Sequence, residues 1–303
     1  MNLKYHIVRE EQLGPFINDL RSIEKNIEYP LEDGTEGFYI DHGNDYSPFF
    51  TQQGYKTRFL IITNKDRVVG SIAGVWKRVS INKKKYNALY ASDLKIIPKY
   101  RSKGIVKNFL WYLFIRWPFT KEFQGWDFIY FCAMQRNSRG VESTFKGVHL
   151  GKLTKPNGLL NIYILEPKKF TSIDLDELQY CPENEINLSP NLTDDILWND
   201  GKKNIVSTKD GTIMNLGHLN PSVFYLENKE RLSEALKEVS GRKGGKICFS
   251  IDCRNQKIIN VFEKGGIYTD TKCRVFSFSP FSKPSSNSSR SSLGKISFTK
   301  LAV

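Results

Sequence analysis

The chain has 303 residues, 40% of them hydrophobic and 13% aromatic, and a formal net charge of +13. This length is enough for two domains of ordinary size, and the apolar content is typical of a globular protein rather than a disordered one. The longest apolar run, Phe109 to Ile115, is far too short to cross a bilayer, and the N-terminus lacks a signal-peptide pattern. We therefore expect a cytoplasmic protein with no membrane partner.

The cysteines, the histidines and the distribution of charge narrow the classes of protein and of site that the chain can represent. The five cysteines form no Cys-x-x-Cys pair and the four histidines show no ligand spacing, so neither a disulfide framework nor a metal site is expected. Up to Phe170 there are 27 Lys and Arg against 16 Asp and Glu, and afterwards 18 against 16. This basic first half suits a polyanionic cofactor or a nucleic acid. Nucleic acid is the weaker alternative, because no element alternates aromatic and basic residues toward a groove.

The first element that we predict in chain order is a helix over residues 10–25, with apolar residues at helical spacing. Residues 29–56 then form an irregular segment, and such long segments are commonly functional. Three consecutive antiparallel strands follow over residues 59–63, 67–77 and 86–97, the first two joined at Asn64-Lys65-Asp66. Four polar residues lie in the irregular segment: Asp41, His42, Asp45 and Tyr46.

The third strand leads into a short basic turn that ends at Gly104, and a helix is predicted from Ile105 to Trp117, where Pro118 ends it. Free amides and the positive dipole end of a helix, with cations beside them, favour an anion such as a phosphate. The alternative is a strand-turn-helix unit that binds nothing. We expect the aromatic helix to pack in the core. Strands are also predicted over residues 126–134 and 159–165, with a short helix between them.

The amino-acid sequence of the turn indicates a particular family more specifically than the predicted strand-turn-helix arrangement does. The stretch Leu94-x-Ile96-x-Pro98-x-Tyr100-Arg101-x-Lys103-Gly104-Ile105 resembles motif A of the GCN5-related N-acetyltransferase (GNAT) superfamily, and the order of elements from Tyr5 to Pro167 is similar as well. The resemblance implies an α+β fold, a mixed and mostly antiparallel sheet flanked by helices, with acetyl-CoA as co-substrate. It implies cofactor contacts from the backbone of Leu94 and Ile96 and from the loop residues Arg101, Ser102, Lys103, Gly104, Ile105 and Val106. Val106 departs from the family, which has Gly or Ala there.

The resemblance also implies roles outside the loop. The irregular segment over residues 29–56 lies over the acceptor site in the family, so Asp41, His42, Asp45 and Tyr46 become candidates for substrate contact, with an ordinary surface loop as the alternative. For the aromatic helix, selection of a longer acyl chain is the alternative to packing in the core. Asn137 would contact the pantetheine arm, and a helix N-cap is its alternative role. Asp93 resembles the acidic residue that begins motif A in amine-acetylating members, and it would be the general base if burial raises its pKa. Its alternative role is to hold a loop in place. The tyrosine that protonates the leaving thiolate in the family is absent, since Thr144 and Phe145 stand at its place.

The second half resembles part of the same pattern. Residues 250–267 follow the family's order of a strand, an asparagine (Asn255), a helix and a glycine, with Phe262 at the tyrosine position. Before them we predict a strand over 212–219 and a helix over 229–239. No basic glycine loop joins these two elements, so we predict a GNAT domain over 1–168 and a degenerate GNAT-like domain over 169–303, with a Ser-rich loop near 283–294.

The activity that these features predict is transfer of an acetyl group from acetyl-CoA to an amine of a small molecule or peptide. A non-catalytic acyl-CoA-binding or interaction module is the alternative.

Overall fold

The computed structural model describes residues 2–30, 37–81, 84–101, 103–135, 154–174, 177, 185–187, 197–198, 203–219, 229–279 and 297–298. Its helices are α1 (Ile17–Lys25), α2 (Pro48–Thr51), α3 (Ile105–Arg116), α5 (Lys229–Ser240) and α6 (Gln256–Lys264). Its strands are β1 (Leu3–Val8), β2 (Tyr29–Pro30), β3 (Gly37–Asp41), β4 (Lys56–Asn64), β5 (Arg67–Ile81), β6 (Lys84–Ile96), β7 (Phe128–Gln135), β8 (Lys155–Leu165), β9 (Glu185–Asn187), β10 (Leu197–Trp198), β11 (Asn204–Ser207), β12 (Ile213–Leu219), β13 (Gly245–Asp252), β14 (Lys272–Phe278) and β15 (Ser297–Phe298).

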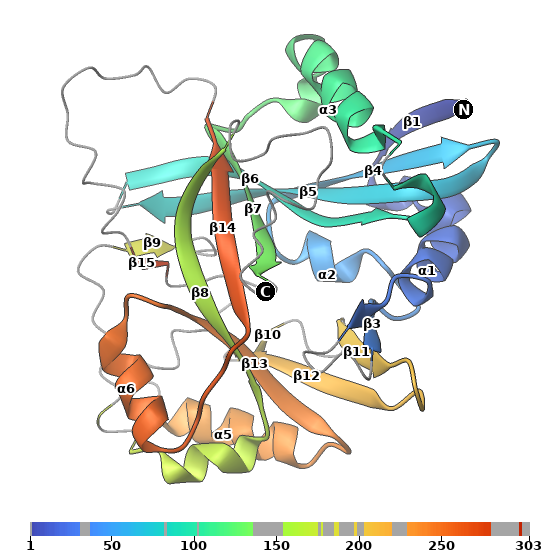
Figure 1. Cartoon of the computed structure of the whole chain (residues 1–303). Helices are drawn as coiled ribbons and strands as arrows, with labels where there is room; N and C mark the ends of the chain where they lie inside the picture. The colour runs from blue at the N-terminus through green and yellow to red at the C-terminus, as the bar shows by residue number, and fades with distance from the viewer. Residues whose placement is uncertain are drawn as a thin grey trace.

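A single mixed sheet runs through both halves of the chain, in the order β1-β4-β5-β6-β7-β14-β8-β13-β12-β11-β3-β2. The predicted three-stranded meander is present as β4, β5 and β6, and Lys65 and Asp66 have positive φ at the first turn, as a tight hairpin requires. The α3 helix lies on one side of this part of the sheet, and α1 and α2 lie on the other (Figure 1). Most of the strand pairs are antiparallel, so the predicted fold class is confirmed.

Strands from the two halves of the chain pair with one another. β14, from the end of the chain, pairs with β7 on one side and β8 on the other, and β8 pairs in turn with β13 (Figure 1). β3, from the first half, pairs with β11 of the second. One buried core accordingly contains side chains from both predicted domains, including Leu160, Leu216 and Val275. The division of the chain at residue 168 stays a prediction.

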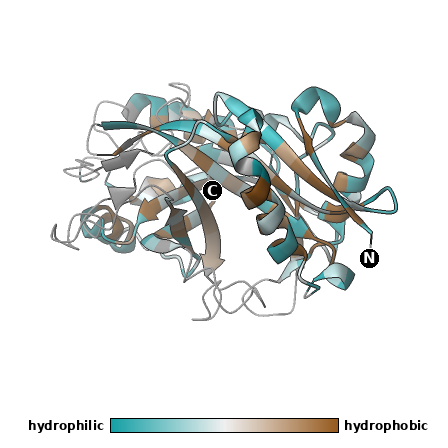
Figure 2. Cartoon of the chain, turned by 90° about the horizontal axis from the view of Figure 1, so that it is seen from above, coloured by the Kyte–Doolittle hydropathy of each residue, from teal (hydrophilic) through white to brown (hydrophobic). Residues whose placement is uncertain are grey.

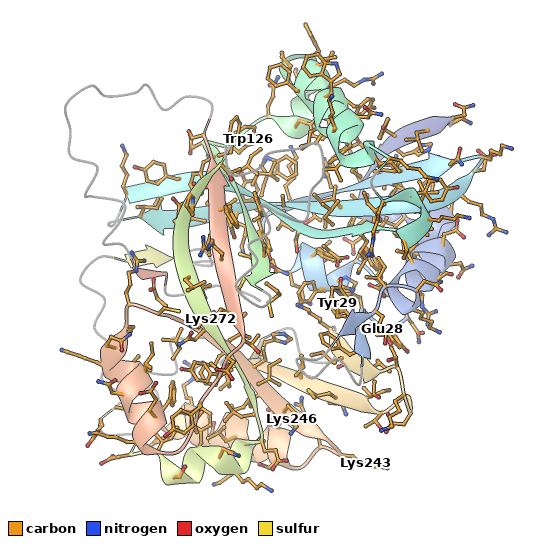
Figure 3. All side chains as sticks on the ribbon, viewed as in Figure 1. Glu28, Tyr29, Trp126, Lys243, Lys246 and Lys272 are labelled. Atoms are coloured by element: carbon orange, nitrogen blue, oxygen red, sulfur yellow. The ribbon has the colours of Figure 1, made fainter. Side chains whose placement is uncertain are left out.

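The second half repeats a unit of the first. β12 and β13 are parallel strands joined through α5, as β6 and β7 are parallel strands joined through α3. The predicted strand over 212–219 and helix over 229–239 are confirmed. The basic stretch after α5, residues 241–246, is a surface turn: Arg242 pairs with Glu238, and Lys243 and Lys246 lie at the end of the molecule away from α3 (Figure 3).

Two predicted helices differ from the structure. Residues 10–16 form two short 3-10 turns, and α1 begins only at Ile17, because Pro15 lacks a donor and restricts the residue before it. The prediction that the aromatic helix packs in the core is wrong for most of α3. Only Ile105 and Phe109 are buried there, because the helix meets the sheet through one narrow stripe and leaves the rest of its apolar surface exposed. Among the described residues, no helix is long and apolar enough to span a bilayer.

Candidate active site

The site lies where β6 bulges and separates from β7. Ser71 of β5 faces Lys95 and Ala73 faces Ser92, so that Asp93 and Leu94 together face one residue of β5. Asp93 adopts a φ of 56° at this bulge. Pairing with β7 ends at Tyr90, although both strands continue, and Figure 1 shows β7 turning away from β6. From Ser92 to Ile96 no described strand pairs with the β7-facing edge, which leaves backbone groups for a ligand.

The predicted anion cradle follows directly. After the 3-10 turn Pro98–Tyr100, Gly104 takes a φ of 73° and α3 begins. That conformation favours glycine, and a Cβ there would meet nothing within 4 Å, so the space in front of the first helical turn is open. A twelve-residue helix with free first-turn amides is a competent anion site.

Exposed cations surround the cradle. The Nζ atoms of Lys99 and Lys103 lie 5.3 and 5.4 Å from the ring centroid of Tyr100. The Arg101 Nε donates to the carbonyl of Ile96 at 3.0 Å, which pins the basic turn to the end of β6. These contacts hold two lysines and one arginine within the same turn, and together they supply the positive charge that a pyrophosphate requires.

Val106, the departure from the family pattern, has a role in packing. Its side chain is partly buried against the cluster that joins α3 to β4, β5 and β6. Ile105 is buried in the same cluster. The bulk at Val106 therefore helps to hold α3 on the sheet. Ser102 and Asn137, the other predicted cofactor contacts, lie outside the described residues, as do Thr144 and Phe145.

On the opposite side of β6 five polar side chains form a buried network, which we call the Lys95 cluster: Glu24, His42, Tyr46, Asp93 and Lys95. The Lys95 Nζ donates to Glu24 Oε1 and to Asp93 Oδ2, each at 2.7 Å. The Tyr46 hydroxyl donates to the same Asp93 Oδ2 at 2.5 Å, and His42 Nδ1 contacts Glu24 Oε1. Both of these donors bond the Oδ2 atom of Asp93 rather than Oδ1.

The network sets the protonation of its members. Burial raises the pKa of Asp93, but the charges of Lys95 and His42 and the donated hydrogen bonds lower it more, to about 2. Burial lowers the pKa of Lys95, but Asp93 and Glu24 raise it above its usual value. Burial raises the pKa of Tyr46 well above 10. Asp93 is therefore ionised at neutral pH, and the raised pKa on which its role as general base depended is not found.

The cluster also contains a set of potential metal ligands. Ligand atoms of Glu24, His42 and Asp93 lie within 4.8 Å of one another. The Lys95 ammonium already bonds both carboxylates, so the positive charge that these acids need comes from a side chain of the chain itself.

The four predicted substrate contacts fall into two groups. His42 and Tyr46 join Asp93 in the Lys95 cluster. Asp41 and Asp45 instead shape the loop, since Asp41 accepts from the amide of Gly43 and Asp45 from the amide and hydroxyl of Ser47. Substrate contact by these four residues stays a prediction.

Sequence reasoning missed two members of the cluster, Glu24 and Lys95. The spacing of each residue from its neighbours in the sequence could have indicated it. Glu24 stands four residues after Leu20, on the buried face of α1, and Lys95 stands two residues after Asp93, on the same face of β6. An acid on a buried helix face and a base beside a candidate acid on a strand together indicate a buried ion pair.

The low pKa of Asp93 predicts a loss of stability in acid. The folded pKa of about 2 lies below the ordinary 3.8, so the ionised form stabilises the fold above about pH 4, and this contribution is lost as pH falls toward 2. Compared with Asp93→Asn, we expect the stability advantage of the wild type to shrink by about 1 kcal/mol between pH 6 and pH 3. Urea unfolding of both proteins at the two pH values measures the difference, and an unchanged gap would contradict the assignment.

In the second half of the chain, the residue at the family's tyrosine position, Phe262, is part of the core. Asn255 caps α6, with its side chain accepting from the amide of Ile258 at 3.5 Å. Phe262 is fully buried and packs against the rings of Tyr163, Phe170 and Phe249. This half presents no proton donor at the family's tyrosine position.

No family model matches the sequence, and no curated protein matches it significantly. Among solved structures, that of Saccharomyces cerevisiae N-myristoyltransferase with bound myristoyl-CoA is similar with a TM-score of 0.57 at 10% identity, over 100% of this chain and 86% of that chain. Another structure of the yeast enzyme with bound myristoyl-CoA gives 0.52 at 11% identity, over 91% and 82%. A GCN5-related N-acetyltransferase from Kribbella flavida gives 0.44 at 12% identity, over 91% and 71%.

The fold of this chain is thus the mixed, mostly antiparallel sheet flanked by helices that the sequence predicted. More particularly, the whole chain follows the fold of N-myristoyltransferase. At these identities the likeness concerns the fold.

Proposed function

We propose that this protein is an acyltransferase that moves an acyl group from an acyl-CoA to an amine. The observation that carries the proposal is the position of the cradle and of the Lys95 cluster on the two sides of β6. The cradle at Gly104 opens on the α3 side of the sheet, and the Lys95 cluster lies on the α1 side, with the bulge at Asp93 between them. A cofactor held by its phosphates would reach the unpaired edge of β6, and an acceptor would meet it from the other side.

In the reaction, the nitrogen of a neutral amine attacks the thioester carbonyl. The new C–N bond forms, the C–S bond breaks, CoA leaves as a thiolate and the amine loses a proton to water. Backbone amides along the free edge of β6 would stabilise the charge on the carbonyl oxygen. Asp93 Oδ1 would accept a hydrogen bond from the acceptor ammonium before deprotonation. A carboxylate with a pKa of about 2 binds an ammonium well and holds a proton poorly, so Asp93 positions the acceptor, and water takes both the proton that the ammonium loses before attack and the proton that the nitrogen loses after it.

The donor and the acceptor are narrower parts of the proposal. The buried rings of Tyr90 and Tyr130 stack with their centroids 4.8 Å apart where β6 and β7 part, so side chains fill the gap between the two strands at that point. That crowding favours acetyl-CoA over a long-chain donor. The ionised Asp93 favours an acceptor that carries an ammonium, as the amine of a small molecule or peptide does.

The second candidate is a non-catalytic acyl-CoA-binding module. Two observations favour it: Asp93 is a weak base, and Phe262 fills the core at the tyrosine position of the second half. The two candidates share the cradle and differ only in turnover, so one experiment separates them.

The test compares binding with turnover. At a hundredfold excess over its dissociation constant, acetyl-CoA is expected to add about 2.7 kcal/mol to stability and to raise the unfolding temperature by several degrees. An amine library followed by thiol release then reports the reaction, with myristoyl-CoA as the alternative donor. Asp93→Asn should keep the thermal shift and lower thiol release by about a hundredfold.

The outcomes separate the candidates. A shift without thiol release for any amine would favour the non-catalytic module. The absence of a shift with either donor would contradict both.

A further inference from the structure

The outward side of α3 is apolar. We call Trp111, Phe114, Ile115 and Phe119 the aromatic face; they are exposed to 62%, 64%, 50% and 87%. The rings of Trp111 and Phe114 stack with their centroids 5.8 Å apart, so they form one continuous surface. Figure 2, which views the molecule from the α3 side, shows hydrophobic segments on this helix. Large apolar side chains gathered in this way on a soluble protein mark an interaction surface.

The charge along α3 and its flanks is basic up to Glu122, which pairs with Arg9. From Lys99 to Lys121 the chain carries six basic residues and no acidic one. All six are exposed, and they lie at both ends of α3: Lys99, Arg101, Lys103 and Lys107 at or before its start, Arg116 and Lys121 at or after its end. An exposed apolar strip beside exposed cations suits a partner surface that is both apolar and anionic, as an anionic membrane interface is.

We propose that α3 docks on the surface of an anionic membrane. The aromatic face would enter the boundary between headgroups and acyl chains, where Trp and Phe are favoured, and the basic residues outside the cradle, Lys107, Arg116 and Lys121, would contact lipid phosphates. Charge complementarity selects this partner, because a stretch without acidic residues is attracted to an anionic surface. The proposal does not depend on the proposed acyltransferase activity. The expectation of no membrane partner considered only spans, and it took the helix to be buried.

The experiment is co-sedimentation of the full chain with vesicles of phosphatidylcholine, with and without about 30% phosphatidylglycerol. We expect binding to the anionic vesicles that weakens with salt and is at least about tenfold weaker on neutral ones. Trp111→Ser/Phe114→Ser and Lys107→Glu/Arg116→Glu should each weaken binding by at least about tenfold, since one basic residue near such a surface contributes a factor of about five.

Two matched controls change an exposed residue elsewhere. Ile213→Ser removes a half-exposed apolar side chain from β12, and Lys243→Glu reverses a charge at the end of the molecule away from α3 (Figure 3). Both should bind vesicles as the wild type does. Circular dichroism checks that all variants remain folded.

Several results would overturn the proposal. One is equal binding to neutral and anionic vesicles, and another is full binding by both α3 double variants. A third is a wild-type dimer that Trp111→Ser/Phe114→Ser makes monomeric, with no vesicle binding, because the aromatic face would then be a contact between copies of the chain. Tighter binding to a single-stranded oligonucleotide than to the vesicles would assign the surface to nucleic acid.

Discussion

Replacing Lys95 with methionine is expected to lower the free energy of unfolding at pH 7 by about 3–5 kcal/mol. Lys95 is 2% exposed, and its ammonium is the donor shared by Glu24 and Asp93. Without it, the two buried carboxylates lose the ammonium that lies between them, and His42 remains in contact with Glu24. Because domains have only about 5–15 kcal/mol of stability, this variant should melt roughly 10 °C lower. Thermal and urea unfolding both measure the loss.

Two features of the Lys95→Met result would distinguish a broken charge network from lost packing. The deficit should shrink as pH falls from 7 to 5, since protonation neutralises the two acids. Lys246→Met is the matched control, because Lys246 and its partner Glu166 are partly exposed at 3.4 Å, and such pairs contribute little. If Lys95→Met loses no more stability than Lys246→Met, the cluster does not stabilise the fold in the way described.

Local patterns predicted the part of the fold that depends on neighbours in sequence. Alternation of side chains and a tight turn at Lys65 and Asp66 were enough for β4, β5 and β6, and helical spacing was enough for α5. β1, β3 and β14 were missed for the opposite reason. β1 and β3 pair with β4 and β11, which do not adjoin them in the chain, and β14 inserts between β7 and β8, which lie more than a hundred residues before it. Nothing local specifies such partners.

The site shows the same limit. Motif A predicted the cradle from consecutive residues, and Asp93 was found because it adjoins that motif. The cluster around it comes from three separate elements, α1, the loop before α2, and β6, which the fold brings together. The pKa of Asp93 could not be predicted without Lys95, since burial and a neighbouring ammonium act in opposite directions. Exposure of α3 likewise depends on which side of the helix the sheet covers.

Gly104→Asp is expected to weaken acyl-CoA binding by about a hundredfold or more. The new carboxylate would stand in the open space before the first turn of α3, where a pyrophosphate is expected, and two like charges about 5 Å apart at an effective dielectric constant of 20 repel by roughly 3 kcal/mol. Gly104→Asn is the matched control, because it has nearly the same shape, tolerates the positive φ and carries no charge. It should retain most of the binding.

A second control separates charge from backbone strain. Gly211→Asp introduces the same residue at a φ of 70° on a turn between β11 and β12, again with no atom within 4 Å of the new Cβ. It should lose a similar amount of stability and none of the affinity for acyl-CoA. Calorimetric titration of the three variants with CoA measures both the loss and its salt dependence. Equal affinity in Gly104→Asp and Gly104→Asn would show that no phosphate lies at the start of α3, because a fixed negative charge there cannot leave a bound pyrophosphate unaffected.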